Sequence, residues 1–351
     1  EKTKIGDIAI VVGGGTPDTN TSQYWNGKIQ WFTPSEIGRN KYVYNSVRTI
    51  SEEGLNKSSA KLLPIGTILL SSRATVGECS INKKECTTNQ GFQSLIPKEN
   101  ISNEFVYYLI QTKRKDLIRK SCGSTFLEIS ANEVRKIVVS IPSIKEQDKI
   151  AKLLSLLDDR IATQNKIIDK LQSLIKGIAQ KIVRNNKPNV RLSECLECKS
   201  STLQESEVCE QGTYPVYGAN GIVGYLDNYS TEGEAIYIIK DGSGVGTVSY
   251  VEGKCSATGT LNTLQAKEDY SLQYLYYLLK VFNFEPYKTG MAIPHIYFKD
   301  YGKAKVFCPS YIEQLRYARL LSAIDNKLSA EQHLLTNLSL QKQYLLRQMF
   351  I

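Results

Sequence analysis

Two groups of side chains have types and spacings that could support chemistry with a metal ion. Asp241 precedes Glu252-Gly253-Lys254, an acid followed by an ExK element, which is an order that can hold a divalent cation for phosphodiester cleavage. Cys195 and Cys198 form a CxxC pair, and Cys209 would be a third zinc ligand. The sequence therefore raises two possibilities, a nuclease and a structural zinc site.

An internal repeat argues against both possibilities. Lys4–Val11 aligns with Arg191–Cys198, which places the two cysteines opposite Ile8 and Val11 and favours a role as small buried hydrophobes. Neither of the two histidines lies near the CxxC pair. The segment around Ser72–Glu85, which aligns with the acid and ExK element, has no equivalent constellation. We therefore expect no catalytic residue, no metal and no cofactor in this chain.

Motifs for phosphate or cofactor binding are equally weak. Gly13-Gly14-Gly15 superficially resembles a phosphate loop, but no Gly-Lys-Ser/Thr and no helix start follow it, so we predict a turn. The chain has neither an Asn/Asp-Pro-Pro-Tyr/Phe element nor a strand–GxGxxG–helix loop, which argues against methyl transfer by this chain.

The strongest signal is a sequence written twice, starting at Ile141 and again at Cys308. Pro142, Ser143, Glu146 and Gln147 each recur as the same residue type 167 positions later. A proline, a serine that can cap, and a glutamate three residues after the serine are typical of a helix N-terminus. Each copy therefore predicts the start of a long helix.

Apolar residues at heptad spacing follow both helix starts. Gln164 interrupts the spacing in the first helix, Glu331 interrupts it at the matching position in the second, and Lys342 is a further interruption there. The predicted seam of the first helix comprises Leu154, Leu157, Ile161, Gln164, Ile168, Leu171, Ile175 and Ile178. That of the second comprises Leu321, Ile324, Leu328, Glu331, Leu335, Leu338 and Leu345. We predict that the two helices form a coiled coil with each other, in which Gln164 and Glu331 help to fix the register. The alternative is that each helix packs only on its own domain.

The repeat divides the chain into a domain at 1–145, a helix at 146–187, a domain at 188–308 and a helix at 309–351. Both domains are predicted to have a mixed α/β (α+β) fold. In the first domain we predict a strand at 28–33, a turn and buried strand at 62–71, a polar loop at 87–92 and a helix at 105–120. Landmarks shared by the two domains are Gly66 with Gly233, Val76-Gly77 with Val245-Gly246, Tyr107–Leu109 with Tyr276–Leu278, and Gly123 and Ile129 with Gly290 and Ile296.

Charge and composition restrict the partners and the compartment. The net charge is +9, and the basic excess lies in the first domain and first helix, which suits a polyanion. No apolar run is long enough to span a membrane. The chain has eight cysteines, and we expect them to be free thiols, which fits a reducing cytoplasm better than a disulfide scaffold does. Residue 1 is a glutamate, so we expect an upstream piece to be missing.

Two variable α/β domains, each followed by a Pro-Ser-x-x-Glu-Gln…Leu-Leu-Ser-x-x-Asp helix, resemble the specificity subunit of type I restriction–modification systems over the whole chain. The resemblance implies two target-recognition domains, each reading one half of a split site on double-stranded DNA. It implies an antiparallel coiled coil that separates them and docks two DNA adenine methyltransferase subunits, with restriction/translocase subunits added. It also implies that the chain itself does no chemistry.

Base discrimination needs amide, guanidinium or hydroxyl groups at the groove edges, whereas lysines hold phosphates. The predicted base-reading residues lie in polar loops and at strand ends: Gln30, Thr33, Ser35, Arg73, Asn89 and Gln90 in the first domain, and Tyr217, Asn220, Ser243, Thr258 and Asn262 in the second. The predicted phosphate contacts are Lys28, Lys83 and Lys84 in the first domain, and Lys240 and Lys254 in the second.

Two further alternatives remain open from sequence. The chain would be the specificity chain of another multisubunit restriction system, or a coiled-coil scaffold whose domains bind no DNA. The sequence does not give the target bases, the spacer length, the self-association of the chain, or whether the system restricts or only methylates.

Overall fold

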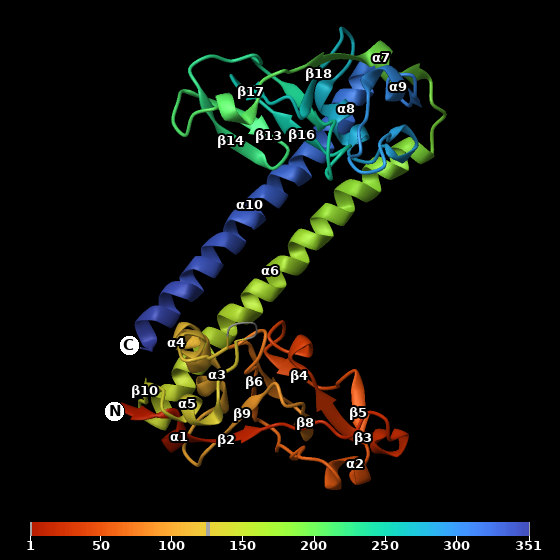
Figure 1. Cartoon of the computed structure of the whole chain (residues 1–351). Helices are drawn as coiled ribbons and strands as arrows, with labels where there is room; N and C mark the ends of the chain where they lie inside the picture. The colour runs from red at the N-terminus through yellow and green to blue at the C-terminus, as the bar shows by residue number, and fades with distance from the viewer. Residues whose placement is uncertain (1, 124–126, 351) are drawn as a thin grey trace. The chain divides into compact units, whose positions relative to one another are not determined.

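The computed structural model describes residues 2–123 and 127–350. The chain forms two compact units, residues 1–163 with 335–351 and residues 164–334. Each unit combines one mixed α/β domain with parts of two long helices, α6 (Ile144–Arg184) and α10 (Tyr311–Met349) (Figure 1). Among the described residues, no helix has the length and apolar character needed to cross a membrane.

The domain of the first unit contains a five-stranded sheet in the order β2-β9-β6-β7-β4 and a three-stranded sheet in the order β5-β3-β8. The strands, in chain order, are β1 Lys2–Lys4, β2 Ala9–Gly13, β3 Trp25–Phe32, β4 Tyr42–Val43, β5 Arg48–Ile50, β6 Ile68–Leu70, β7 Cys79–Asn82, β8 Cys86–Thr88, β9 Gln93–Pro97 and β10 Val138–Ser140, the last pairing with β1. The α-helices are α1 Ile5–Ile8, α2 Glu52–Asn56, α3 Asn103–Thr112, α4 Arg114–Arg119 and α5 Ala131–Arg135.

The domain of the second unit repeats this plan with a four-stranded sheet, β12-β18-β15-β16, and a three-stranded sheet, β14-β13-β17. Its strands are β11 Val190–Arg191, β12 Leu196–Ser200, β13 Tyr214–Gly218, β14 Gly221–Leu226, β15 Ala235–Ile239, β16 Val248–Val251, β17 Ser256–Ala257, β18 Leu261–Ala266 and β19 Lys305–Val306, the last pairing with β11. The α-helices are α7 Leu192–Cys195, α8 Leu272–Leu279 and α9 Phe298–Tyr301. One parallel pair joins each smaller sheet, β3–β8 in one domain and β13–β17 in the other, which confirms the predicted repetition of a mixed α/β fold.

Aligned glycines adopt the same unusual backbone in both domains. Gly66 and Gly233 have φ of 87° and 82°, and Gly77 and Gly246 have φ of 88° and 91°. Only glycine enters this left-handed region without strain, so these turns need glycine. The predicted alignment of the two domains is therefore confirmed at the level of individual turns.

Two local predictions were wrong in detail. The helix predicted over 105–120 is interrupted at Lys113, whose φ of −92° and ψ of 5° separate α3 from α4. The polar loop predicted over 87–92 begins later, because Thr87 and Thr88 belong to the buried strand β8. Both threonines suit a strand, since β-branched side chains pack well on a pleated surface.

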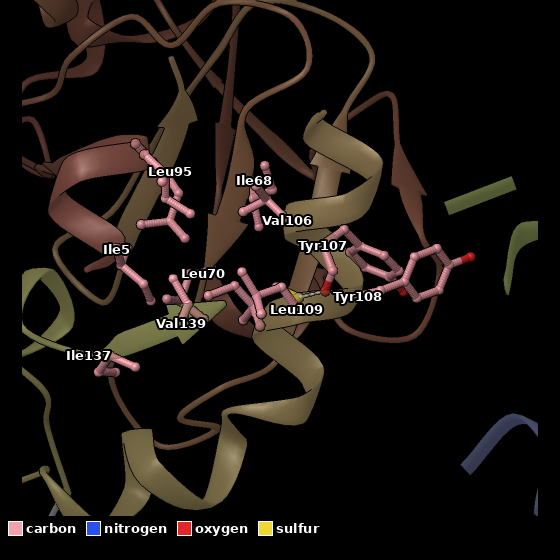
Figure 2. Packing of buried hydrophobic residues seen from close by; sticks show 14 of the residues in the cluster. Ile5, Ile68, Leu70, Leu95, Val106, Tyr107, Tyr108, Leu109, Ile137 and Val139 are labelled. Atoms are coloured by element: carbon pink, nitrogen blue, oxygen red, sulfur yellow. Dashed lines mark hydrogen bonds between the residues drawn. The ribbon is translucent and has the colours of Figure 1, made fainter. Parts of the chain in front are cut away.

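The core of the first unit lies between the larger sheet and α3. Figure 2 shows Val106 and Leu109 of α3 directed toward Ile68 and Leu70 of β6, and all four are buried. Hydrophobic burial of this kind stabilises the domain because it removes apolar area from water.

The repeated glutamine at each long-helix start joins that helix to its domain. The Gln147 side chain donates to Pro142 O at 3.0 Å and accepts from the backbone N of Ser102, which precedes α3, at 3.0 Å. Gln314 makes the same two bonds, to Pro309 O at 2.9 Å and from Ser271 N at 2.9 Å. Gln147 and Gln314 are therefore buried side chains that hydrogen-bond the start of each long helix to the neighbouring domain.

The repeated aspartate makes a second join. Asp158 accepts a hydrogen bond from Tyr108 at 2.7 Å, and Asp325 accepts one from Tyr277 at 3.2 Å. Both tyrosines belong to the aligned domain helices α3 and α8. The sequence motif that marks the long helices is thus explained by contacts with the domains beside them.

The two long helices pack antiparallel in each unit. In the first unit Asp158 of α6 pairs with Lys342 of α10 at 2.6 Å, and in the second Gln164 donates to the backbone O of Glu331 at 3.0 Å and to its carboxylate. All fifteen predicted seam side chains are buried or half-buried. Leu345 of α10 also packs against the core of the first domain, so the alternative in which each helix packs only on its own domain is wrong.

The Glu331 carboxylate should make the second unit sensitive to acid. Hydrogen bonds from Lys327, at 2.5 Å, and from Gln164 hold the pKa of Glu331 below its usual value. A carboxyl group with a lowered folded pKa stabilises the fold above its unfolded pKa, and this stabilisation is lost as pH falls through the folded pKa. The measurement is the urea unfolding midpoint, followed by helical circular dichroism, as a function of pH. Below about pH 4.5, we expect this midpoint to fall more steeply with decreasing pH in the native chain than in Glu331→Gln. Parallel pH curves for the two proteins would contradict this assignment.

Candidate nucleic-acid interface

A strained turn presents Arg73 at one edge of the first domain. Ala74, which follows it, has φ of 57°, a left-handed conformation that is uncommon for a residue with a side chain. Backbone and hydroxyl bonds hold the turn, since Ser71 Oγ donates to Arg73 O at 2.9 Å and Gly77 N donates to Ser71 O at 3.2 Å. Strain of this kind is found preferentially at functional sites, and here it fixes where a guanidinium leaves the surface.

A loop carrying Asn89 and Gln90 lies against this turn. Gly91 connects the two, because its O accepts from Ser72 N at 2.8 Å and its N donates to Asn89 Oδ1 at 2.9 Å. Asn89 N in turn donates to Phe32 O at 3.0 Å, at the end of β3, and Gln90 is exposed and hydrogen-bonded to Thr16. The structure thus gathers Arg73, Asn89 and Gln90 with the end of β3, which leads directly into Thr33 and Ser35.

A backbone bridge between Cys122 and Glu128 completes this edge. Cys122 and Glu128 exchange two backbone hydrogen bonds of 2.9 Å, and Glu128 Oε1 accepts from Arg73 Nε at 2.8 Å. The ion pair engages Nε of Arg73, and a guanidinium is the group that makes a bidentate pair with O6 and N7 of guanine. We call the Arg73 turn, the 89–91 loop and the bridged pair Cys122 and Glu128 the first polar edge.

The second domain builds an edge of the same design from different side chains. Thr289 and His295 exchange backbone hydrogen bonds of 2.9 and 2.8 Å, and Gly242 N donates to Pro294 O at 2.9 Å. His295 Nδ1 lies 2.7 Å from Asp241 Oδ1, where the first domain has Arg73 paired with Glu128. We call residues 240–244, 258–260 and 289–295 the second polar edge.

The acid and ExK residues do not form a nuclease-like group. Hydrogen bonds from Lys240, at 2.5 Å, and from His295 outweigh burial, which acts in the opposite direction, and lower the pKa of Asp241. Lys254 pairs instead with Glu232, at 3.7 Å. Asp241 and Lys254 are therefore engaged in separate interactions.

The cysteines of the CxxC pair differ in their surroundings. Cys195 is fully buried, whereas Cys198 is half-buried and Cys209 is exposed and paired through its backbone with Tyr225. Over the described residues, no group of three His, Cys, Asp or Glu side chains is arranged to hold a metal ion.

The remaining predicted contact residues are spread more widely. Lys28 is exposed on β3, while Gln30 accepts from Ser46 N at 2.7 Å. Lys83 lies 4.1 Å from the Tyr42 ring centroid and Lys84 donates to Asn45 at 2.7 Å, so both lie on the β7–β8 turn and contact residues 42–45 rather than the first polar edge.

In the second domain, Lys240 and Ser243 lie on the second polar edge, and Asn220 is exposed at the β13–β14 turn. Tyr217 lies beside that edge, since its O accepts from Thr258 N at 2.9 Å. The side chains of Thr258 and Asn262 are 1% and 3% exposed and bond to Thr260 and Ser200, so a duplex would not reach them in this structure.

Comparison with known proteins places the chain in a family. Residues 1–173 and 186–340 each match the type I restriction modification DNA specificity domain. The chain belongs to this family. Both matched segments contain one polar edge and one long-helix start, so the type I specificity family accounts for the internal repeat.

Named relatives in the family are specificity subunits. The chain is 42% identical over 175 residues to the type I restriction enzyme MjaIX specificity subunit of Methanocaldococcus jannaschii, covering 48% of this chain and 40% of that protein. It is 32% identical over 161 residues to the EcoR124I/EcoR124II specificity subunit of Escherichia coli, covering 44% and 40%. The EcoprrI specificity subunit of Escherichia coli is 24% identical over 341 residues, covering 89% and 84%. The chain thus spans 40% of the length of each of the first two relatives.

Solved structures share the fold. The S subunit of a type I restriction-modification system from M. genitalium has a TM-score of 0.67 at 19% identity, covering 100% of this chain and 96% of that one. A chain from a structure on complex assembly and conformational transition of the type I R-M system has a TM-score of 0.61 at 16% identity, covering 99% and 96%.

Sequence reasoning about this specificity-family chain missed the apolar tip of the hairpin at residues 289–295, on the second polar edge. Met291 is completely exposed and Ile293 is 58% exposed, between Gly290 and Pro294 on the second polar edge. A search for polar side chains passes over such residues, although apolar groups also contact thymine methyls and base steps. The short apolar run between Gly290 and Pro294 is the sequence signal that could have identified this exposed tip.

Proposed function

We propose that this chain is the non-catalytic DNA specificity subunit of a type I restriction–modification complex. Each domain, 1–145 and 188–308, would read one half of a split double-stranded site. The spacer helices, 146–187 and 309–351, would set the separation of the half-sites and dock two adenine methyltransferase subunits. Restriction/translocase subunits would join this assembly, and methylation and cleavage would take place in the partners.

The observation that carries the proposal is that one polar-edge design occurs twice with unlike side chains. Arg73 with Glu128 in the first edge and Asp241 with His295 in the second are attached to equivalent turns and backbone bridges. Equivalent scaffolds with different polar groups are suited to two different base sequences, because each base pair presents its own donors and acceptors in the major groove. The proposed compartment is the cytoplasm, in keeping with eight free thiols.

A map of methylated adenines in host DNA, with and without the gene, tests this function. Loss of one split motif on deletion would support the proposal and supply both half-sites. An unchanged map would favour the scaffold alternative, provided that the methyltransferase gene is expressed. Specificity chains of other multisubunit restriction systems would be distinguished by purifying the partners that assemble with this chain.

Replacing Arg73 with alanine should weaken recognition of the first half-site. A bidentate arginine contributes about 1–3 kcal/mol of base discrimination, so we expect a loss of affinity of roughly 5- to 150-fold. The measurement is equilibrium binding by the reconstituted methyltransferase complex to duplexes with either half-site scrambled. Arg119→Ala, which removes the same charge from an exposed position of α4, is the control. Equal losses in the two variants would mean that Arg73 acts only through net charge.

Because Glu128 would lose its partner in Arg73→Ala, the double variant Arg73→Ala/Glu128→Ala is also needed. If the double variant recovers full affinity, repulsion between Glu128 and DNA explains the loss and Arg73 does not read a base.

A further inference from the structure

Two thiols lie in contact inside the second unit. The Sγ atoms of Cys195 and Cys308 are 3.9 Å apart, and these residues are 0% and 6% exposed. Cys195 ends α7, and Cys308 follows β19 and precedes the start of α10. A disulfide bond is about 2.05 Å long, so the sulfurs would have to approach by about 2 Å, which side-chain rotation and small backbone adjustments can supply.

The internal repeat provides a comparison for this pair. Cys195 aligns with Ile8 and Cys308 aligns with Ile141. Ile8 belongs to the core cluster of the first unit, and the partly buried Ile141 packs against that cluster. The second unit thus has cysteine at both positions where the first has a branched apolar side chain. Packing alone explains one buried cysteine. Two cysteines in contact at both aligned positions add a capacity that the isoleucines do not have.

The surroundings give the two thiols different roles. The hydrogen bond with Cys308 lowers the pKa of Cys195, against the effect of burial, and raises that of Cys308. Asn189 holds the backbone of Cys308 on both sides, since its Nδ2 donates to Cys308 O at 2.7 Å and its Oδ1 accepts from Cys308 N at 2.9 Å. Cys195 is therefore the better nucleophile, and Cys308 is fixed within its reach.

We propose that Cys195 and Cys308 form an oxidisable dithiol, which peroxide converts into a disulfide that ties α7 to the start of α10. The Cys195 thiolate attacks one peroxide oxygen, the O–O bond breaks, and the hydroxide released takes up a proton to become water. The Cys308 sulfur then attacks the resulting sulfenic acid, the S–O bond breaks, and a second water leaves. Two thiols lose two electrons and two protons, and one peroxide is reduced to two waters.

This cross-link would change the stability of the second unit independently of DNA recognition. Residues 195 and 308 are 113 positions apart, and every strand of the second domain except β11 lies between them in the sequence. Closing so long a loop restricts the unfolded chain strongly. Oxidation should therefore raise the unfolding temperature of this unit by on the order of 5–10 °C.

The test is to treat the full chain with hydrogen peroxide and to digest it without reduction. Mass spectrometry should find Cys195 linked to Cys308, and calorimetry should show the higher unfolding temperature, reversed by dithiothreitol. Running the test in Cys122→Ser/Cys209→Ser removes the two exposed thiols as competitors.

The matched control restores the pair present in the first unit, Cys195→Ile/Cys308→Ile, and should unfold at the same temperature with and without peroxide. Cys308→Ala serves the same purpose if the larger side chains prevent folding. The proposal is overturned if Cys195 is oxidised to sulfinic acid without linkage, if a different pair of cysteines links, or if both thiols remain free after peroxide treatment.

Discussion

Replacing Phe350 with alanine is expected to lower the free energy of unfolding of the first unit by about 3 kcal/mol. Phe350 is 7% exposed and belongs to the core cluster of the first domain, with its ring centroid 5.0 Å from that of Phe105 on α3. Alanine would leave a cavity against a fully buried aromatic ring, so both the apolar transfer energy and the packing contacts are lost.

Tryptophan fluorescence can follow this unit alone. The only two tryptophans in the chain, Trp25 and Trp31, are buried together in the first domain, with ring centroids 5.0 Å apart. Tyr344→Ala, at a position on α10 that is 63% exposed, should leave the urea midpoint unchanged. A midpoint for Phe350→Ala equal to that of Tyr344→Ala would show that Phe350 does not stabilise the first unit.

Replacing Gly14 with alanine is expected to weaken recognition of the first half-site strongly and to leave recognition of the second half-site unaffected. A Cβ at Gly14 would lie 2.0 Å from Asn89 O and 2.4 Å from Thr88 Oγ1. No real Cβ atom approaches that closely, so the 89–91 loop of the first polar edge would have to move. We expect a loss of affinity of about 10-fold or more, the amount that corresponds to roughly 1.4 kcal/mol.

Gly13→Ala is the matched control, because a Cβ there would have its nearest neighbour, Gln93 Oε1, at an ordinary 3.7 Å. Both variants should be assembled with the methyltransferase partners and tested on duplexes that have either half-site scrambled. The role given to the 89–91 loop is refuted if both alanine variants discriminate the first half-site equally well. Circular dichroism would separate loss of recognition from loss of folding.

The long helices could be predicted because their signal is periodic and local. Seam residues repeat at heptad spacing over many turns, and the paired interruption at Gln164 and Glu331 appears as a direct hydrogen bond in the structure. Phe350 could not be found in this way. Its partner, Phe105, is distant in sequence, and no local pattern reports such a contact.

Prediction of the polar edges was limited for the same physical reason. Arg73, Asn89 and Gln90 could be proposed from residue type, but their proximity depends on Gly91 and on the strained turn at Ala74. Thr258 and Asn262 have suitable polar groups, yet strand geometry and the adjoining loop bury both. Residue type suggests what a side chain could contact, whereas its accessibility depends on pairings between distant segments.

The discontinuity of the first unit has a consequence for synthesis on the ribosome. Residues 335–351 belong to this unit but are translated after the whole of the second unit. The nascent first domain therefore exposes the surface that Leu345 and Phe350 later cover, and it must remain unaggregated meanwhile. Its last folding step joins segments separated by nearly the full length of the chain, a closure that is entropically costly and slow. Conditions that slow translation should therefore prolong the period in which this protein depends on chaperones.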